Sequence, residues 1–320
     1  MLVGAIIGSG KDQNKDRIRM LKEQYDHMEE RNLYLSDLYN NALQNKEQFK
    51  DQIVGYKDSF GRLYDVTLKL NNTMPEAVFK EALEVMEDIL NNKSIAIYTL
   101  SSGSSYARLN LCSKPLNNKL MRSISLDSYN EMSKDLKDGA VWFNKEYLEG
   151  YPIYCAPIYK QEELVSLVMI YEVSYAQLAM YYVNLIRIIC GLLQNSLVRA
   201  IDYEGMAGQD IYYENTMIMK KERFAELLNV KNELQEKDFS NYILLRLNIK
   251  SDDLKEISDM VVSRVRVSDV IGIGPDDKVY LILSQVTDDN AEYAYKRLLQ
   301  AGISFKRVST AHLMKRQESI

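Results

Sequence analysis

The chain has 320 residues, of which 46% are hydrophobic and 27% charged, so it can form two globular domains and a connecting element. The formal net charge of -5 provides no field that would attract nucleic acid polymers, and two histidines leave little for zinc sites or histidine-based triads. Three cysteines without metal-ligand spacing indicate buried thiols in a reducing compartment.

Residues 1–55 predict a helical stalk. From Ile18 onward, apolar residues recur at alternating intervals of three and four, which is the heptad pattern of a coiled coil. Asn32 and Lys46 stand at seam positions, where polar side chains weaken a coil but fix its register, a use best attested in parallel dimers. We therefore expect a homodimer through the stalk. The alternative is a long amphipathic helix that packs on its own domain.

Residues 56–205 predict a domain that combines a sheet with helices. Pro75 and Glu76 begin a helix, since proline suits a first turn and an acid suits the positive end of the helix dipole. Ser174 is expected to cap a long exit helix. The other expected elements are strands at 94–100, 106–112, 141–143, 152–158 and 164–173, a middle helix at 126–136, and the exit helix at 175–201.

This order of elements resembles a GAF domain, and the resemblance rests on pattern alone. GAF domains often bind small ligands between the sheet and the middle helix, so four aromatic residues could line such a pocket. They are Tyr98, Tyr106, Trp142 and Tyr154. Aromatic side chains at such positions more often belong to the core, and we favour that interpretation.

The remaining residues predict a linker at 206–215, a second domain at 216–310 and a loose tail at 311–320. The second domain is expected to contain helices at 217–235, 252–262 and 290–301, strands at 242–249 and 303–308, and two strands that flank a turn at 272–276. Helices that alternate with strands around a hairpin predict an antiparallel sheet. The predicted fold class is α/β (α+β), with an N-terminal coiled-coil helix, a GAF-like domain and this second domain.

An Arg-x-x-Asp pattern stands just before the predicted hairpin. The pattern begins at Arg62, Arg199 and Arg266, and three occurrences give it little weight alone. In GGDEF-type diguanylate cyclases, an inhibitory Arg-x-x-Asp site lies five residues before the GGDEF turn. Here Asp269 is followed by a strand, and residues 275–279, Pro-Asp-Asp-Lys-Val, occupy the place of that turn in register. The second domain therefore resembles a GGDEF domain.

The turn itself departs from the cyclase pattern. Proline and aspartate replace the two glycines that let the backbone approach substrate phosphates, and a lysine follows Asp277 where an acid would stand. Arg246 and Asn248 lie where the pattern has metal-binding aspartates. We expect no catalytic residues, no metal site, no cofactor and no cyclase activity. An enzyme with unusual metal ligands is a rival that the absent carboxylates disfavour.

Arg266 and Asp269 have side chains that suit a guanine nucleotide. A planar guanidinium can bind guanine O6 and N7, stack on the base or bind phosphate. A carboxylate can accept hydrogen bonds from guanine N1–H and N2–H. The alternative is an exposed ion pair at the end of a helix, which contributes little. The register with the degenerate turn favours the receptor interpretation.

A GAF-like domain followed by a degenerate GGDEF domain that keeps Arg-x-x-Asp is similar to the PelD family of cyclic-di-GMP receptors, over roughly residues 60–308. The resemblance implies that cyclic di-GMP binds at Arg266 and Asp269. In that family further arginines complete the site, and Arg297 and Arg62 are the candidates here.

The resemblance also implies a cellular role and partners. It implies signalling that regulates Pel-type exopolysaccharide synthesis, and hence biofilm formation, through membrane-associated synthase subunits. Because that family has membrane helices ahead of the GAF domain, we expect a cytoplasmic protein at the inner face of the membrane, held there by a missing segment or a partner. The alternative function is a small-ligand sensor that uses the GAF pocket, with the second domain as a dimerisation scaffold.

Overall fold

The computed structural model describes residues 65–249 and 253–309, together with 20–22, 25, 28–29 and 31–32. The chain divides into two compact units, Met1–Asp65 and Val66–Ile320. The described residues of the first unit are helical and exposed. Most of the predicted stalk lies outside the described residues, so its coiled-coil pairing stays a prediction.

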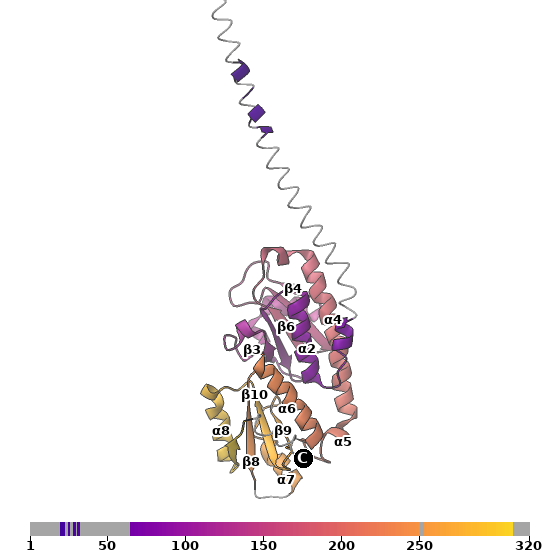
Figure 1. The fold of residues 1–320 in the computed structure, drawn as a ribbon, viewed down its shortest axis with the longest axis vertical. Helices are drawn as coiled ribbons and strands as arrows, with labels where there is room; N and C mark the ends of the chain where they lie inside the picture. Colours follow the sequence, from indigo (N-terminus) through magenta and orange to yellow (C-terminus); the bar gives the residue numbers. More distant parts are fainter. Residues whose placement is uncertain are drawn as a thin grey trace, which may run out of the picture. The chain divides into compact units, whose positions relative to one another are not determined.

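The described part of the unit Val66–Ile320 has an α+β fold with two sheets, as the sequence predicts (Figure 1). The strands of the first sheet are all antiparallel and run in the order β3-β2-β1-β6-β5-β4. They span β1 (Ile95–Leu100), β2 (Tyr106–Cys112), β3 (Ser123–Ser125), β4 (Trp142–Phe143), β5 (Tyr154–Lys160) and β6 (Glu163–Ile170). The edge strand β3 was not predicted, because three residues carry no detectable period.

Different helices cover the two faces of the first sheet. α2 (Pro75–Ile89) and α4 (Met180–Met206) pack on the face to which Ile97 of β1 points. α3 (Asn130–Lys137) packs on the other face, which contains Tyr98. Successive side chains of a strand point to opposite sides, so β1 contributes to both clusters and both faces are buried.

The exit helix begins later than predicted. Ser174 forms a capping box with Gln177, but the turn that it caps is the 3-10 helix Tyr175–Leu178. Ala179 then has extended backbone angles, and α4 begins at Met180. Among the residues that the structure describes, no helix combines the length and the hydropathy needed to cross a bilayer.

The strands of the second sheet run in the order β11-β8-β10-β9-β7. Its strands are β7 (Ile218–Met219), β8 (Tyr242–Asn248), β9 (Val270–Ile273), β10 (Val279–Ser284) and β11 (Ser304–Arg307), and the helices around it are α5 (Gly208–Ile211), α6 (Lys221–Glu236), α7 (Leu254–Val262) and α8 (Ala291–Gln300). α6 packs against Tyr280 and Ile282 of β10, whereas α7 and α8 pack against Leu281 and Leu283 on the other face. Because both faces are buried, the β9–β10 hairpin is held in place, and polar side chains gather at its two ends.

The segment between the two sheets differs from the prediction. Residues 206–215, predicted as a linker, include the helix α5, and Ile211 packs in a core cluster. The helix predicted from 217 begins at Lys221, because the two residues Ile218–Met219 form β7. β7 pairs with β9 in parallel, so the predicted antiparallel sheet has one parallel edge. A two-residue strand has no periodicity that a sequence could reveal.

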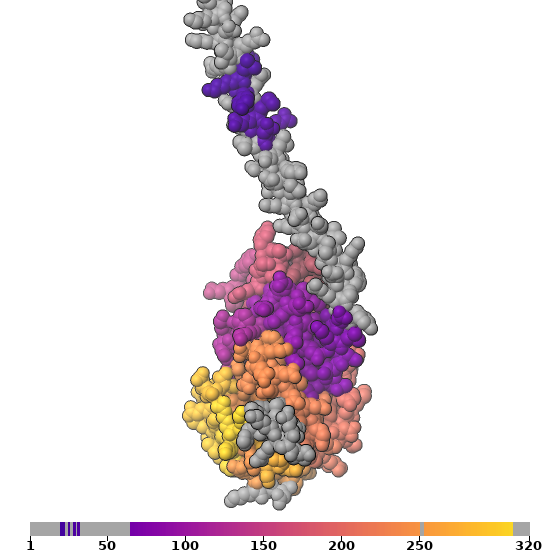
Figure 2. Space-filling model, in the orientation of Figure 1, coloured from indigo at the N-terminus to yellow at the C-terminus, as the bar shows by residue number. Residues whose placement is uncertain are grey.

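The GAF-like domain and the second domain contact each other along α2 and α6. Lys237 and Glu84 form an ion pair at 2.7 Å, and the N–H of Cys112 donates to the carbonyl of Phe239 at 2.9 Å. Figure 2 shows the orange surface of α6 against the purple surface of α2. A second contact joins Arg122 of the first domain to the carbonyl of Gln285 in the second, and a cavity beside it has walls from both domains.

Candidate functional site

The turn before β9 holds Arg266 and Asp269 in a closed loop. The Asp269 N–H donates to the Arg266 carbonyl at 2.9 Å, and the Arg266 N–H donates to Asp269 Oδ2 at 2.9 Å. Aspartate side chains commonly close turns by accepting from nearby backbone donors. The three-residue spacing of Arg-x-x-Asp therefore lets the aspartate fix the backbone that carries the arginine.

The other carboxylate oxygen of Asp269 is bonded to the second strand of the hairpin. The N–H of Ser284, at the end of β10, donates to Asp269 Oδ1 at 3.1 Å. Burial raises the pKa of Asp269, while the two backbone donors and the charges of Arg266 and Arg297 oppose that shift. Each carboxylate oxygen can accept more than one hydrogen bond. Asp269 is thus an oriented acceptor with capacity left for a ligand.

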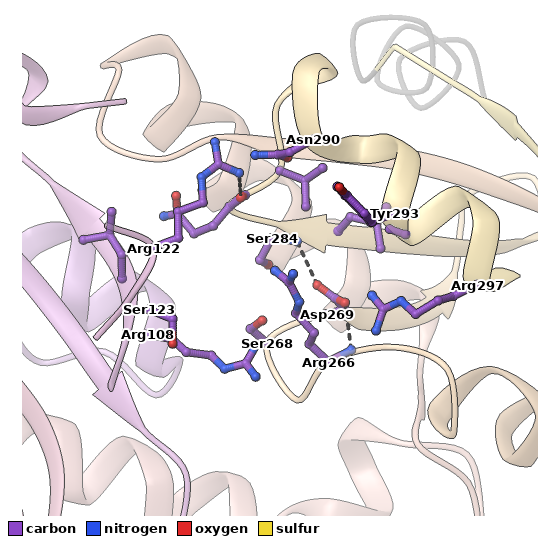
Figure 3. A pocket seen from close by; sticks show the side chains of 15 residues that line it. Arg108, Arg122, Ser123, Arg266, Ser268, Asp269, Ser284, Asn290, Tyr293 and Arg297 are labelled. Carbon is purple, nitrogen blue, oxygen red and sulfur yellow. Dashed lines mark hydrogen bonds between the residues drawn. The ribbon is translucent and has the colours of Figure 1, made fainter. Parts of the chain in front are cut away.

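A cavity of about 290 Å³ lies in front of this turn (Figure 3). Arg266 from the turn and Arg297 from α8 line it together with Asp269. Figure 3 shows the Arg297 side chain extending from its helix toward Asp269. Within the described part of the chain, the guanidinium groups of Arg266 and Arg297 form no hydrogen bond and no ion pair within 4 Å. Both arginines therefore keep their donors for a ligand.

The opposite wall of the cavity comes from the GAF-like domain. Arg108 lies on β2, and Arg122 directly precedes β3. Arg122 Nη2 donates to Thr287 Oγ1 at 3.2 Å, and its Nη1 donates to the carbonyl of Gln285. The cavity thus gathers four arginines against one aspartate, and this excess of positive charge favours an anionic ligand.

Reasoning from the sequence missed these two arginines. Arg108 occupies an exposed position of a strand whose neighbouring residues are buried, and Arg122 lies between two short elements. Neither belongs to a motif. The contact between the domains alone brings them to the cavity, so no local signal could have revealed them.

The four residues predicted to bind the ligand have different outcomes. Arg266, Asp269 and Arg297 line the cavity. Arg62 lies outside the described residues, and its role stays a prediction.

The Arg-x-x-Asp copy that begins at Arg199 is arranged differently. It lies within α4, so its backbone is helical and cannot form the turn seen before β9. Asp202 forms an ion pair with Lys160 at 2.7 Å, and Arg199 Nη2 donates to Ser196 Oγ at 3.2 Å. Both side chains of this copy are therefore bonded to the protein.

At the far end of the hairpin, side chains of the protein fill the space beside the turn between β9 and β10. Tyr280 donates its hydroxyl hydrogen to Asp276 Oδ2 at 3.2 Å, and Arg246 Nη1 lies 3.9 Å from the same oxygen. A Cβ atom at Gly274 would stand 2.4 Å from the Tyr280 ring. Among the described residues, no group of three His, Cys, Asp or Glu side chains could hold a metal ion.

Three of the four aromatic residues considered for a GAF pocket belong to the core. Tyr98, Trp142 and Tyr154 are buried in hydrophobic clusters, which confirms the core interpretation for them. Tyr98 and Tyr154 each donate a hydroxyl hydrogen to a backbone carbonyl at 2.9 Å, so their polar ends are satisfied inside the protein. Tyr106 is exposed on the surface, so it is neither a core residue nor part of a buried pocket.

No family model matches the chain, and no curated protein matches it significantly. Among solved structures, it is similar to PelD residues 158 to the C-terminus from Pseudomonas aeruginosa PAO1, with 10% identity, a TM-score of 0.33, and coverage of 78% of this chain and 89% of that chain. PelD 156–455 from Pseudomonas aeruginosa PA14 in complex with c-di-GMP has 12% identity, a TM-score of 0.32, and coverage of 73% and 81%. The GAF domain of an Acinetobacter phosphoenolpyruvate-protein phosphotransferase has 14% identity, a TM-score of 0.34, and coverage of 45% and 95%. None of these similarities assigns the chain to a family.

Proposed function

We propose that this protein is a non-catalytic receptor for cyclic di-GMP. The observation that carries the proposal is the cavity in which four arginines face one aspartate whose two carboxylate oxygens are held by backbone donors. Cyclic di-GMP has two phosphates and two guanine bases. Arginine binds both phosphate and the base edge, and aspartate accepts from the guanine donors, so the ligand suits this set of side chains.

In the proposed complex, Arg266 and Asp269 bind different edges of one guanine. Asp269 accepts from N1–H and N2–H, while Arg266 donates to O6 and N7 or stacks on the base. Arg297 extends toward the same carboxylate in Figure 3 and adds a donor for O6 or a phosphate. Arg62 is proposed as a further arginine of the site on the family resemblance alone.

The proposed receptor does not synthesise cyclic di-GMP. Lys278 and Arg246 stand where the cyclase pattern has acids, and Tyr280 fills the space beside the turn. A cyclase needs carboxylates at these places to hold metal ions against substrate phosphates. In this proposal the hairpin has kept the ligand-binding end of a cyclase domain and lost its catalytic end.

The proposed output is control of exopolysaccharide synthesis of the Pel type. Cyclic di-GMP favours one arrangement of the receptor, and membrane-associated synthase subunits bind that arrangement. The ligand must bind one arrangement more tightly than the other, since equal affinity shifts no equilibrium. A homodimer through the stalk presents two receptors to the synthase, and these partners place the protein at the cytoplasmic face of the membrane.

Isothermal titration calorimetry with cyclic di-GMP tests the site. We expect micromolar or tighter binding to the wild-type protein and a loss of about 10- to 100-fold in Arg266→Ala and in Asp269→Ala, because each change removes charge-assisted hydrogen bonds. Arg264→Ala is the matched control. Arg264 is exposed, lies two residues before Arg266 and does not line the cavity, so its loss should leave the affinity within about twofold.

Three outcomes would contradict the proposal in different ways. Failure of the wild-type protein to bind at micromolar ligand would refute the receptor function. Unchanged affinity in both Arg266→Ala and Asp269→Ala would show that the ligand binds elsewhere on the protein. Formation of a dinucleotide product on incubation with GTP and Mg²⁺ would refute the absence of catalysis.

A further inference from the structure

The GAF-side wall of the cavity contains an arginine without a partner in the described part of the chain. Arg108 is exposed on β2, and no described residue hydrogen-bonds to or pairs with its guanidinium group. It lies opposite Ser123 in the register of β2 and β3. Figure 3 shows the Arg108 side chain extending into the cavity toward Ser268 of the other wall. A planar cation in this position is placed to bind an anionic group of a ligand.

A β-bulge next to Arg108 connects this wall to the second domain. Tyr98 pairs with Leu109 and Ile97 pairs with Leu111, so Asn110 is an extra residue on β2. Bulges redirect backbone and side-chain groups near functional sites. Here the Asn110 carbonyl accepts a hydrogen bond from the side-chain amide of a residue in the other domain, Gln285. The two domains are therefore bonded together beside the cavity.

Gln285 connects the domains through its backbone as well. Its φ of +56° is a left-handed conformation, which is strained for a residue other than glycine and persists where several partners fix it. Its N–H donates to the Asn241 carbonyl at 2.7 Å, and its own carbonyl accepts from Arg122. Ser284, the preceding residue, donates to Asp269 at 3.1 Å. Two consecutive residues thus link the acceptor of the site with an arginine of the GAF-like domain.

Positive charge accumulates where the two walls meet. Burial, and after it the charge of Arg266, lowers the pKa of Arg122, while Asp289 acts in the opposite direction. Asp269 is the single acidic residue among those that line the cavity. A ligand phosphate would supply the negative charge that this junction lacks.

We propose that Arg108 binds a phosphate of the cyclic dinucleotide, so that the ligand bridges the two domains. The inference rests on the proposed function and assigns a role to the second wall: Arg266 and Asp269 bind a base from one domain, and Arg108 binds a phosphate from the other. Arg122 is a positioning residue that holds the two walls together. Ligand binding then requires both domains and stabilises their junction.

Calorimetry of Arg108→Ala with cyclic di-GMP tests the phosphate contact. We expect affinity about 10- to 100-fold weaker than wild type, and partial recovery in Arg108→Lys, which keeps the charge but loses the planar fork. Arg187→Ala is the matched control, because Arg187 is an exposed arginine of the same domain that does not line the cavity. Arg108 is exposed, so its replacement should not disturb folding.

Hydrogen exchange of the wild-type protein tests the bridge without any substitution. Addition of cyclic di-GMP should slow exchange in residues 106–125 of the GAF-like domain as well as in 263–297. Protection confined to 263–297, or an Arg108→Ala affinity within twofold of wild type while Arg266→Ala loses binding, would overturn the bridge and leave the receptor function standing. Absence of binding by the wild-type protein would instead refute the receptor function, and the bridge with it.

Discussion

Charged side chains lie at both ends of the β9–β10 hairpin. They are paired within the protein at one end, whereas at the other end they line the cavity. At the turn between the strands, Asp276 accepts from Tyr280 and lies near Arg246, and Asp277 pairs with Lys221 at 2.9 Å. These acidic groups are therefore bonded within the protein.

At the other end, arginines outnumber the acid that could neutralise them. The carboxylate of Asp269 is held by two backbone donors, so the side chains of Arg266, Arg297 and Arg108 remain available to the cavity. Residue type alone therefore does not identify a binding end. What distinguishes the two ends is whether the charged groups are already paired.

The largest expected difference between the two ends concerns ligand affinity. Arg297→Ala should weaken cyclic di-GMP binding about 10- to 100-fold, because it removes a charge-assisted contact at the open end. Lys296→Ala is the matched control on the same helix: Lys296 is exposed and pairs with Glu292 at 2.8 Å, away from the cavity. Calorimetry measures both. Equal losses in the two variants would show that α8 contributes general charge and no specific contact.

A smaller effect is expected from pH. Asp269 must be ionised to accept from the guanine edge, and burial raises its pKa above the usual value of 3.8. Affinity should therefore be full above the raised pKa and fall as the pH decreases through it, by up to about tenfold per pH unit. The loss should begin at a higher pH than for an ordinary aspartate.

Calorimetric titrations between neutral and mildly acidic pH measure this dependence. Asp269→Asn is the control, since its side chain does not titrate and its remaining affinity should not follow the same curve. An identical pH profile in the variant would assign the dependence to another group.

The smallest effect is expected at the closed end, and it concerns stability. Tyr280→Phe removes a hydrogen bond to Asp276, whose side chain is 19% exposed, and should lower the free energy of unfolding by about 1–2 kcal/mol. Asp277→Asn is the control. It breaks an ion pair in which Asp277 is 78% exposed, and asparagine tolerates the φ of +57° there, so the free energy of unfolding should stay close to that of the wild type.

Urea unfolding followed by circular dichroism measures both variants, and calorimetry should show unchanged affinity for cyclic di-GMP in both. A loss of affinity in Tyr280→Phe comparable to that in Arg297→Ala would show that both ends of the hairpin contribute to ligand binding, which contradicts the proposed difference between them.

The order of helices and strands was largely predictable because it depends on local patterns. The apolar run of β1, the alternation along β2, the proline at the start of α2 and the turn residues between β9 and β10 act over a few neighbouring residues. Predictions failed where a segment was too short to show a period, as in β3 and β7. They also failed at α4, where a capping signal belonged to a 3-10 turn.

One half of the candidate site could be predicted from local patterns in the sequence. Arg266 and Asp269 could be singled out because the turn that follows the pattern keeps its register. The other half was decided by tertiary structure alone. Arg108 and Arg122 reach the cavity through contacts between residues far apart in the chain, such as Arg122 and Gln285, which are separated by 163 positions. Long-range packing of this kind leaves no periodic or local signal, and only the fold shows which charges meet.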